Sequence, residues 1–423
     1  MARPFDTELL ENMWRGDWRA SSAFTAALPE GDPPLAYGLI ERASTVDLAL
    51  DEVDAEPGER FALRGGGIRV ALHEIPSGPD HRLRGELTEA EAGALERSTF
   101  ALRMDTVLLE PVLDAYHAAL NAVDVLAPDA VAIADEARIQ WLSGAWVRRA
   151  AGSHAPPPPA SLYSLHAVVE GDVAWLHTHG LLRCGSIEVE ALDVPRDDLE
   201  SVTHLVRAAA SRFIERGPPP PGESFEVGER LVLAWRPWDE CAAERPQGAL
   251  GGTEDREEHG GLVGTLVVPT GRKRGILRRH PEWAPLTDLV PVLDDEPLFY
   301  VSTMETRRMA MLASDRFRDF RSLFRRYGRR DDWQFMVKLG YQIDGDESDP
   351  DRSSEHLWFD VHAIDGAEID ATLLNAPIQI ARMEAGDRAV HTADQLSDWT
   401  IHTPDGAFGP DRVDALLGPS RRR

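Results

Sequence analysis

The amino-acid sequence predicts a multi-domain α+β protein, with mainly antiparallel sheets and helices packed on one face. The chain has 423 residues, which is enough for about two or three domains. Strand-like segments come in runs that single helical segments interrupt, an order that favours antiparallel layers over a doubly wound sheet. Two runs of four prolines, at residues 156–159 and 218–221, predict stiff, extended connectors.

The first proline run marks the main predicted boundary between domains. The opening stretch of the chain shows no clear hydrophobic period, so we expect an N-terminal arm there. The second proline run lies between a predicted helix and a predicted strand, as a loop within one domain would. The predicted segments are an arm at 1–34 and α+β domains at 35–153, 161–292 and 298–416.

The predicted elements before the first proline run alternate between strands and helices. Residues 68–75 and 98–104 have strand composition, and residues 130–135 form a short apolar strand. Residues 106–126 carry apolar side chains at helical spacing, and residues 136–150 close the region as a second helix. This order is typical of an α+β domain.

The next two domains repeat this plan in different proportions. The middle one has three strands joined by short connections, then a helix, then two further strands. These are predicted at 162–170, 172–182, 186–194, 196–215, 229–235 and 261–268. The last domain begins with a long amphipathic helix and continues as an antiparallel β-meander. Its elements are predicted at 303–327, 333–343, 356–364, 367–375 and 387–392.

The second strand of the middle domain contains two histidines, His177 and His179. They point to one face, because side chains alternate along a strand. If residues 183–186 form the following hairpin loop, the register places His179 opposite Glu190. Two imidazoles and a carboxylate could form an open zinc or iron site. The favoured interpretation is an ordinary polar sheet face, because a third fixed ligand is missing. We therefore expect no cofactor, with a divalent metal such as Zn²⁺ as the alternative.

A strand of the last domain carries aromatic and titratable side chains on one face. His356, Trp358 and Asp360 alternate there with apolar residues. This face could be a ligand platform, with Trp358 as the stacking surface and His356 or Asp360 as the polar anchor. It could equally be the exposed face of an antiparallel sheet.

The charge of the chain limits the classes of partner. The formal net charge is −27, from 45 basic and 72 acidic residues. Nucleic acid and anionic membranes attract clustered Lys and Arg, so this charge argues against both and favours a basic protein partner. The N-terminal residues lack the basic start and apolar run of a secretory signal, so we expect a cytoplasmic bacterial protein. Cys184 and Cys241 are expected to be reduced, partly buried thiols.

The last quarter of the chain carries four short motifs in a specific order. They are Glu355-His356-x-Trp358, Asn375-x-Pro377, Gly386-Asp387 and Asp398-Trp399. With this order and spacing, the region resembles the small bacterial family catalogued as domain of unknown function 2314. The middle region, with "THGLLRCGSIEVE", looks like a companion segment found beside that domain in other uncharacterised bacterial proteins. The resemblance implies a compact α+β or barrel-like domain, but no activity. The residues that it implies to be important are His356, Trp358, Asn375, Pro377, Asp387, Asp398 and Trp399.

These observations predict a non-enzymatic binding or interaction protein. The sequence has no GxSxG elbow, Walker loop, GxGxxG after a strand, HExxH or paired CxxC. One form would be an immunity- or antitoxin-like protein that binds a basic toxin by charge complementarity. The alternative is a metal-dependent hydrolase or other small-molecule enzyme that uses His177, His179 and Glu190. The ligand or partner site is predicted at His356, Trp358, Asp360, Asp398 and Trp399.

Overall fold

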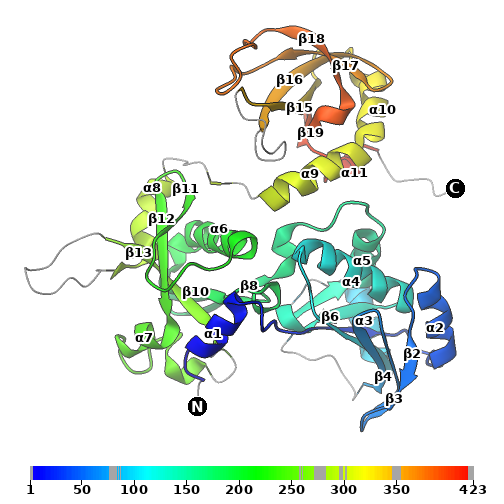
Figure 1. Ribbon diagram of the computed structural model, residues 1–423, viewed down its shortest axis with the longest axis vertical. Coiled ribbons are helices and arrows are strands. Elements are labelled where there is room, and N and C mark those ends of the chain that lie inside the picture. The colour runs from blue at the N-terminus through cyan, green and yellow to red at the C-terminus, as the bar shows by residue number, and fades with distance from the viewer. Residues whose placement is uncertain are drawn as a thin grey trace, which may run out of the picture. The chain divides into compact units, whose positions relative to one another are not determined.

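The computed structural model divides the chain into two compact units, Met1–Ser302 (unit 1) and Thr303–Arg423 (unit 2) (Figure 1). The residues that it describes are 3–75, 83, 85, 87–256, 259, 261–270, 283–294, 299–300, 303–344 and 354–417. Three sheets, mostly antiparallel, combine with helices, so the predicted α+β class is confirmed. Among the described residues, no helix is both long and apolar enough to cross a bilayer.

The first sheet of unit 1 is antiparallel between all neighbouring strands. Its order is β2 (Asp51–Val53), β3 (Glu59–Gly65), β4 (Ile68–Glu74), β5 (Phe100–Thr106), β1 (Ser22–Ala27), β6 (Ala132–Asp135) and β7 (Gln140–Ser143). The helices of this half are α1 (Thr7–Trp14), α2 (Ala36–Ser44), α3 (Glu89–Arg97), α4 (Val112–Leu126) and α5 (Gly144–Ala151).

Strand β1 corrects the expectation of an N-terminal arm at residues 1–34. It pairs with β5 on one edge and with β6 on the other, so it lies inside the sheet. Nearly all of its residues are buried, and a strand covered on both faces shows no polar–apolar alternation. Its sequence, SAFTAA, is also rich in alanine, which strands use little. The pattern therefore gave no signal.

The predicted helix over residues 136–150 is wrong in its first half. Residues 140–143 form β7, which pairs with β6, and α5 begins only at Gly144. Just before β7, Ile139 has a φ of 52°. This left-handed conformation cannot continue a right-handed helix, so the chain turns there into a hairpin.

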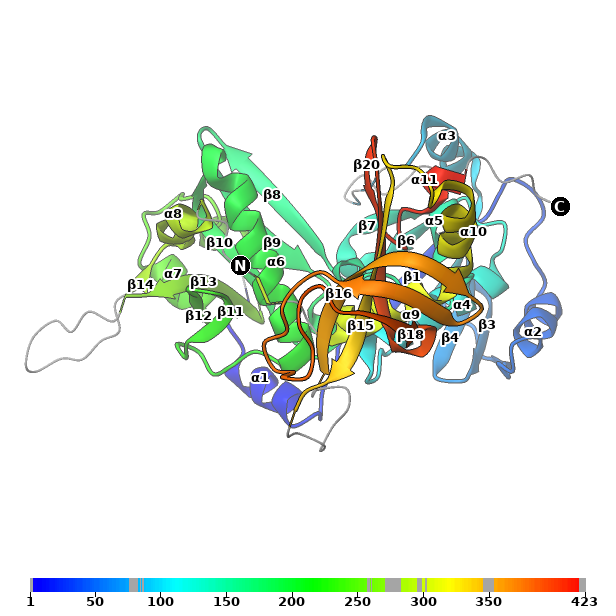
Figure 2. The same cartoon turned by 90° about the horizontal axis from the view of Figure 1, so that it is seen from above.

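The second sheet of unit 1 combines antiparallel pairs with one parallel pair, β10 and β13. Its order is β11 (Phe225–Gly228), β12 (Leu231–Pro237), β13 (Val263–Pro269), β10 (Glu188–Pro195), β9 (Val173–His179) and β8 (Ser164–Glu170), with β14 (Trp283–Ala284) paired to β13. Helix α6 (Leu199–Arg216) packs against β10 (Figure 2). The shorter helices are α7 (Trp238–Ala243) and α8 (Val290–Leu293).

Unit 2 is a curved antiparallel sheet with helices against its apolar face. The strand order is β18 (Arg388–Thr392), β17 (Glu368–Leu373), β16 (Ser354–Asp365), β15 (Gln334–Gln342), β19 (Leu396–Thr403) and β20 (Gly406–Phe408). The predicted helix at 303–327 is divided at Arg316 into α9 (Thr303–Asp315) and α10 (Phe317–Tyr327). A short α11 (Asp414–Leu417) follows the sheet.

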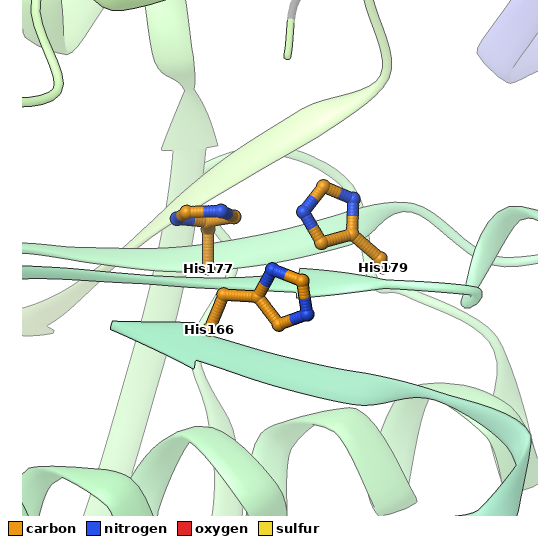
Figure 3. A group of neighbouring side chains, drawn as sticks. All are labelled: His166, His177 and His179. Carbon is orange, nitrogen blue, oxygen red and sulfur yellow. The ribbon is translucent and has the colours of Figure 1, made fainter. Parts of the chain in front are cut away.

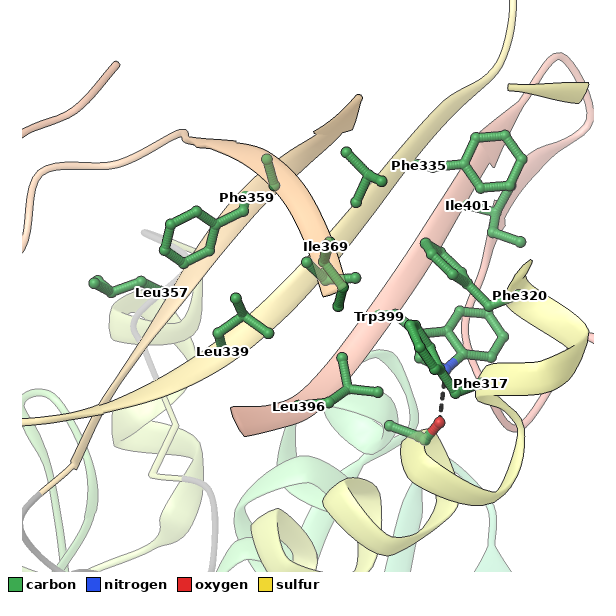
Figure 4. Packing of buried hydrophobic residues seen from close by; sticks show 14 of the residues in the cluster. Phe317, Phe320, Phe335, Leu339, Leu357, Phe359, Ile369, Leu396, Trp399 and Ile401 are labelled. Atoms are coloured by element: carbon green, nitrogen blue, oxygen red, sulfur yellow. Dashed lines mark hydrogen bonds between the residues drawn. The ribbon is translucent and has the colours of Figure 1, made fainter. Parts of the chain in front are cut away.

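The core of unit 2 is centred on aromatic side chains from α10 and the sheet. Phe320 of α10 packs on Trp399 of β19, with ring centroids 5.0 Å apart (Figure 4). The indole Nε1 of Trp399 donates a hydrogen bond to the backbone oxygen of Ala313, at 3.0 Å. Ala313 lies in the last turn of α9, where carbonyls lose helical partners. Trp399 therefore fixes α9 to the sheet.

Replacing Trp399 with phenylalanine should lower the free energy of unfolding of unit 2 by about 1–2 kcal/mol, because it leaves a buried carbonyl without this donor. Differential scanning calorimetry of the full chain measures the change. The matched control is Trp358→Phe on the opposite face, where we expect less than about 0.5 kcal/mol. Equal effects of the two substitutions would contradict this role for Trp399.

Candidate metal centre

Two histidines lie close together on β9, which pairs with β8 on one side and with β10 on the other. His177 is buried, with 4% of its surface exposed, and His179 is half-buried. Their ring centroids are 4.9 Å apart, and both rings lie on the same side of the strand (Figure 3). The prediction that they share a face is confirmed, as expected for residues two apart on a strand.

A third histidine, His166 on β8, joins this pair. The turn at Gly171–Asp172 connects β8 to β9, and the resulting register places His166 directly opposite His177. One ligand nitrogen from each of the three histidines lies within 4.8 Å of the others (Figure 3). His166 was not among the residues predicted from the sequence. Counting back from the turn, where Glu170 pairs with Val173, would have found it.

The predicted register between β9 and β10 needs a correction. Glu190 pairs with His177 and not with His179. The connection from Gly180 to Ile187 contains a 3₁₀ turn, Leu182–Cys184, so it is longer than the four-residue loop assumed from the sequence. A change in loop length moves every pairing along the two strands.

The carboxylate of Glu190 accepts hydrogen bonds from several other side chains. Arg256 Nη2 donates to its two oxygens at 2.7 and 2.6 Å. Thr265 Oγ1 donates at 2.5 Å and the indole Nε1 of Trp175 at 2.9 Å. The structure therefore groups His166, rather than Glu190, with the two predicted histidines.

Burial keeps the two β9 imidazoles neutral. Burial, together with the smaller effects of the neighbouring His259, His166 and Arg256, lowers the pKa of His177 to about 3. Burial and the three neighbouring histidines also lower the pKa of His179 to about 2. A metal ion binds the neutral imidazole, so both side chains are in the ligand form near pH 7.

The ring nitrogens of the cluster are suited to a ligand role. Nδ1 of His177 and Nε2 of His179 are buried and have no hydrogen-bond partner among the described residues, although buried polar atoms are nearly always paired. Ser164 orients the third ring. Its hydroxyl donates to the Arg138 carbonyl at 2.6 Å, so its oxygen accepts from Nε2–H of His166 at 3.2 Å. Nδ1 of His166 then carries the lone pair.

A fourth imidazole, His259, lies beside the cluster. Its ring centroid is 4.8 Å from that of His177 and 5.1 Å from that of His179. His177, His179 and His259 line a pocket of about 180 Å³. Glu188 also lines it, and its carboxylate accepts a hydrogen bond from Thr178 Oγ1 at 2.7 Å. The rest of the lining is mainly apolar, from Ala137, Ile139, Trp175, Leu182, Leu262 and Val263. The pocket thus offers three imidazoles and the carboxylates of Glu136, Glu188 and Glu190.

The second predicted site lies on the sheet of unit 2, on the face away from the core. His356, Trp358 and Asp360 are half-buried there, whereas Leu357 and Phe359 are buried in the core. Asp360 accepts a hydrogen bond from Gln334 at 3.1 Å. The alternation read from the sequence is confirmed, and the ligand platform stays a prediction.

Lys338 of β15, which was not among the predicted site residues, lies in the middle of this face. It pairs with Trp358 on one side and with Asp398 on the other. Its Nζ is 5.7 Å from the centroid of the Trp358 ring. Burial raises the pKa of Asp398 to about 6, although the Trp399 N–H and the Lys338 ammonium act in the opposite direction. The face therefore brings together a cation, an indole and a half-buried carboxyl.

Trp399 does not belong to this face, which corrects its place in the predicted ligand site. It is 1% exposed and packs in the core, with its indole bonded to Ala313. Asp398 and Trp399 are neighbours on β19, so they point to opposite faces of the sheet.

Neither cysteine lines the candidate metal centre. Cys184 and Cys241 are free and buried. Burial raises the pKa of Cys184 to about 12 and that of Cys241 to about 11, so both stay protonated thiols near neutral pH. A protonated thiol is a poor nucleophile and metal ligand.

Family models match three stretches of the chain. Residues 69–157 and 165–265 match the N-terminal and C-terminal parts of "Protein of unknown function (DUF4026)". Residues 309–418 match "Uncharacterized protein conserved in bacteria (DUF2314)". No curated protein and no solved structure matches the chain significantly. The histidine strands β8 and β9 lie in the second matched stretch. The C-terminal quarter thus resembles the bacterial family DUF2314, as predicted, and the region before it resembles DUF4026, both of unknown function.

Proposed function

We propose that unit 1 binds a divalent transition metal, with Zn²⁺ as the first candidate and His166, His177 and His179 as ligands. The observation that carries the proposal is the convergence of three imidazoles, whose ligand atoms lie within 4.8 Å of one another. Zinc sites in proteins are commonly built from histidine, and a set of three is found in catalytic sites.

The state of the side chains supports this proposal over an ordinary polar sheet face. On an ordinary solvated face, three imidazoles would be hydrated and would lie apart from one another. Here His177 is buried, and both β9 imidazoles are neutral. A metal ion would satisfy the buried nitrogens of His177 and His179 at once, removing a cost of about 1–3 kcal/mol for each unpaired group. The strands also hold the ligands in place before binding.

The metal content of purified protein tests the proposal. Protein incubated with Zn²⁺ and then dialysed should carry about one equivalent per chain. The double variant His177→Ala/His179→Ala should lose it, because only one of the three ligands remains. The matched control is His204→Ala, an exposed histidine on α6 of the same unit, which should keep its metal. Elemental analysis provides the readout.

Thermal unfolding gives a second measure on the same proteins. At a Zn²⁺ concentration of 100 times Kd, the metal should stabilise the wild type by about 2.7 kcal/mol. The double variant should fold and show no such gain. The proposal is contradicted if the wild type, offered Zn²⁺, Co²⁺, Ni²⁺ and Cu²⁺ in turn, retains no metal and gains no stability.

The acidity of the chain favours a second candidate, binding of a basic protein partner. We propose this from the net charge of −27, because complementary charge accelerates and orients association. An immunity- or antitoxin-like role would be one form of it. The test is a pull-down from cell lysate followed by rebinding of the purified partner at increasing salt. A basic partner whose affinity falls with salt supports the proposal, and recovery of no partner at low or moderate salt contradicts it.

A further inference from the structure

We infer that His259 is the fourth ligand of this metal site and closes it. This inference rests on the proposed function and goes further, because it decides between a saturated metal and one with a position open to substrate. A hydrolase of the kind considered from the sequence needs the open position.

The spacing of the rings carries the inference. Zn–N distances of about 2.0–2.1 Å place the ring centres of two tetrahedral imidazole ligands about 5 Å apart. The ring centroids of His177 and His179 are separated by 4.9 Å. His259 lies 4.8 Å from the first and 5.1 Å from the second. His166 lies 5.8 and 4.6 Å from the same two rings. His259 therefore lies beside both β9 rings, as His166 does, although the three ligand nitrogens within 4.8 Å of one another are those of His166, His177 and His179.

The chain just before His259 is anchored to the strands that hold the other ligands. Arg256, three residues earlier, is completely buried and donates to both carboxylate oxygens of Glu190. Glu190 is the residue of β10 that pairs with His177. The guanidinium also lies 5.2 Å from the centroid of the Trp175 ring. This buried ion pair fixes Arg256, three residues before His259, against β10.

Trp175 adds a second contact to the same arrangement. Its ring is 4.2 Å from that of His177 and 5.3 Å from that of His259, and its Nε1 is held by Glu190. One indole thus packs against a ligand on β9 and against His259. A metal bound by all four imidazoles would tie β8, β9 and the segment after Arg256 together. This arrangement corresponds to a structural or sensing site, with no coordination position left for water.

Co²⁺ substitution tests the inference on the full chain, because the visible spectrum of Co²⁺ reports coordination number. X-ray absorption should count four imidazoles in the wild type, and added azide should leave its spectrum unchanged. The variant His259→Ala should bind Co²⁺ with three imidazoles, and its visible spectrum should change when azide is added. Its affinity for Co²⁺ should fall at least about tenfold, because loss of a residue that only supports a ligand already costs about tenfold or more. The control is again His204→Ala, which should behave as the wild type.

The azide test on the wild type does not depend on how any variant folds. Three imidazoles together with an azide-sensitive spectrum would overturn the inference and leave the three-histidine site standing as an open one. Absence of Co²⁺ and Zn²⁺ binding in every protein would overturn the proposed function itself. The two failures are therefore distinguishable.

Discussion

Replacing Arg183 with methionine is expected to lower the free energy of unfolding of unit 1 by about 3–5 kcal/mol. Arg183 and Asp135 are both 0% exposed, and the guanidinium donates to the two carboxylate oxygens at 2.7 and 3.0 Å. It also donates to the carbonyl of Leu162, at 2.8 and 3.2 Å. The substitution would leave a buried carboxylate without its counter-charge. Asp135 belongs to the first sheet and Arg183 to the β9–β10 connection, so the pair joins the two halves of unit 1.

Calorimetry on a set of variants measures this effect. Arg183→Met/Asp135→Leu should recover most of the loss, because it removes both charges together. Arg60→Met, which breaks an exposed pair with Glu74, should cost less than about 1 kcal/mol. If Arg183→Met is no more harmful than Arg60→Met, the buried pair does not hold the two halves together.

Replacing Asp398 with asparagine is expected to stabilise unit 2 at neutral pH. Burial raises the pKa of Asp398 from an ordinary 3.8 to about 6, so the folded state disfavours its ionised form. Asparagine keeps the side-chain oxygen that accepts from the Trp399 N–H at 2.8 Å but carries no charge. Each unit of pKa shift corresponds to about 1.4 kcal/mol, so the gain is at most about 3 kcal/mol.

The pH dependence identifies the cause of this gain. Above pH 6 the carboxyl is ionised in both states, and the folded state bears the full cost. As pH falls from 6 towards 3.8, the folded state takes up its proton first and the cost disappears. The advantage of Asp398→Asn should therefore fall from about 3 kcal/mol at pH 7.5 to about 1 kcal/mol at pH 4.5. Melts of the full chain provide the measurement, with the exposed Asp405→Asn as the control. A gain that does not change with pH would rule out the ionisation mechanism.

Much of the sheet structure could be read from the sequence, because strands with one covered face alternate polar and apolar side chains. The strand with Leu357 and Phe359 on one face and Trp358 on the other is an example. The failures have local causes. β1 is buried on both faces and shows no alternation. The division between β7 and α5 depends on the left-handed backbone conformation of Ile139, which hydrophobic periodicity does not predict.

Part of the candidate metal centre could be predicted from the sequence for a related reason. His177 and His179 share a strand, so their proximity follows from a spacing of two. His166 requires the pairing of β8 with β9, which the short turn at Gly171–Asp172 sets. His259 comes three residues after Arg256, whose buried bond to Glu190 joins positions 66 residues apart. Contacts of that range are tertiary and leave no mark in local sequence patterns.

The central position of β1 also has a consequence for synthesis of the chain on the ribosome. Residues 22–27 emerge early, but their partners at 100–106 and 132–135 emerge much later. At about 5–20 residues per second, the nascent strand waits for several seconds with both hydrogen-bonding edges open. An apolar strand with open edges readily pairs with other chains. Newly made chains of this protein should therefore depend on chaperones during that interval, more than a sheet assembled from successive hairpins would.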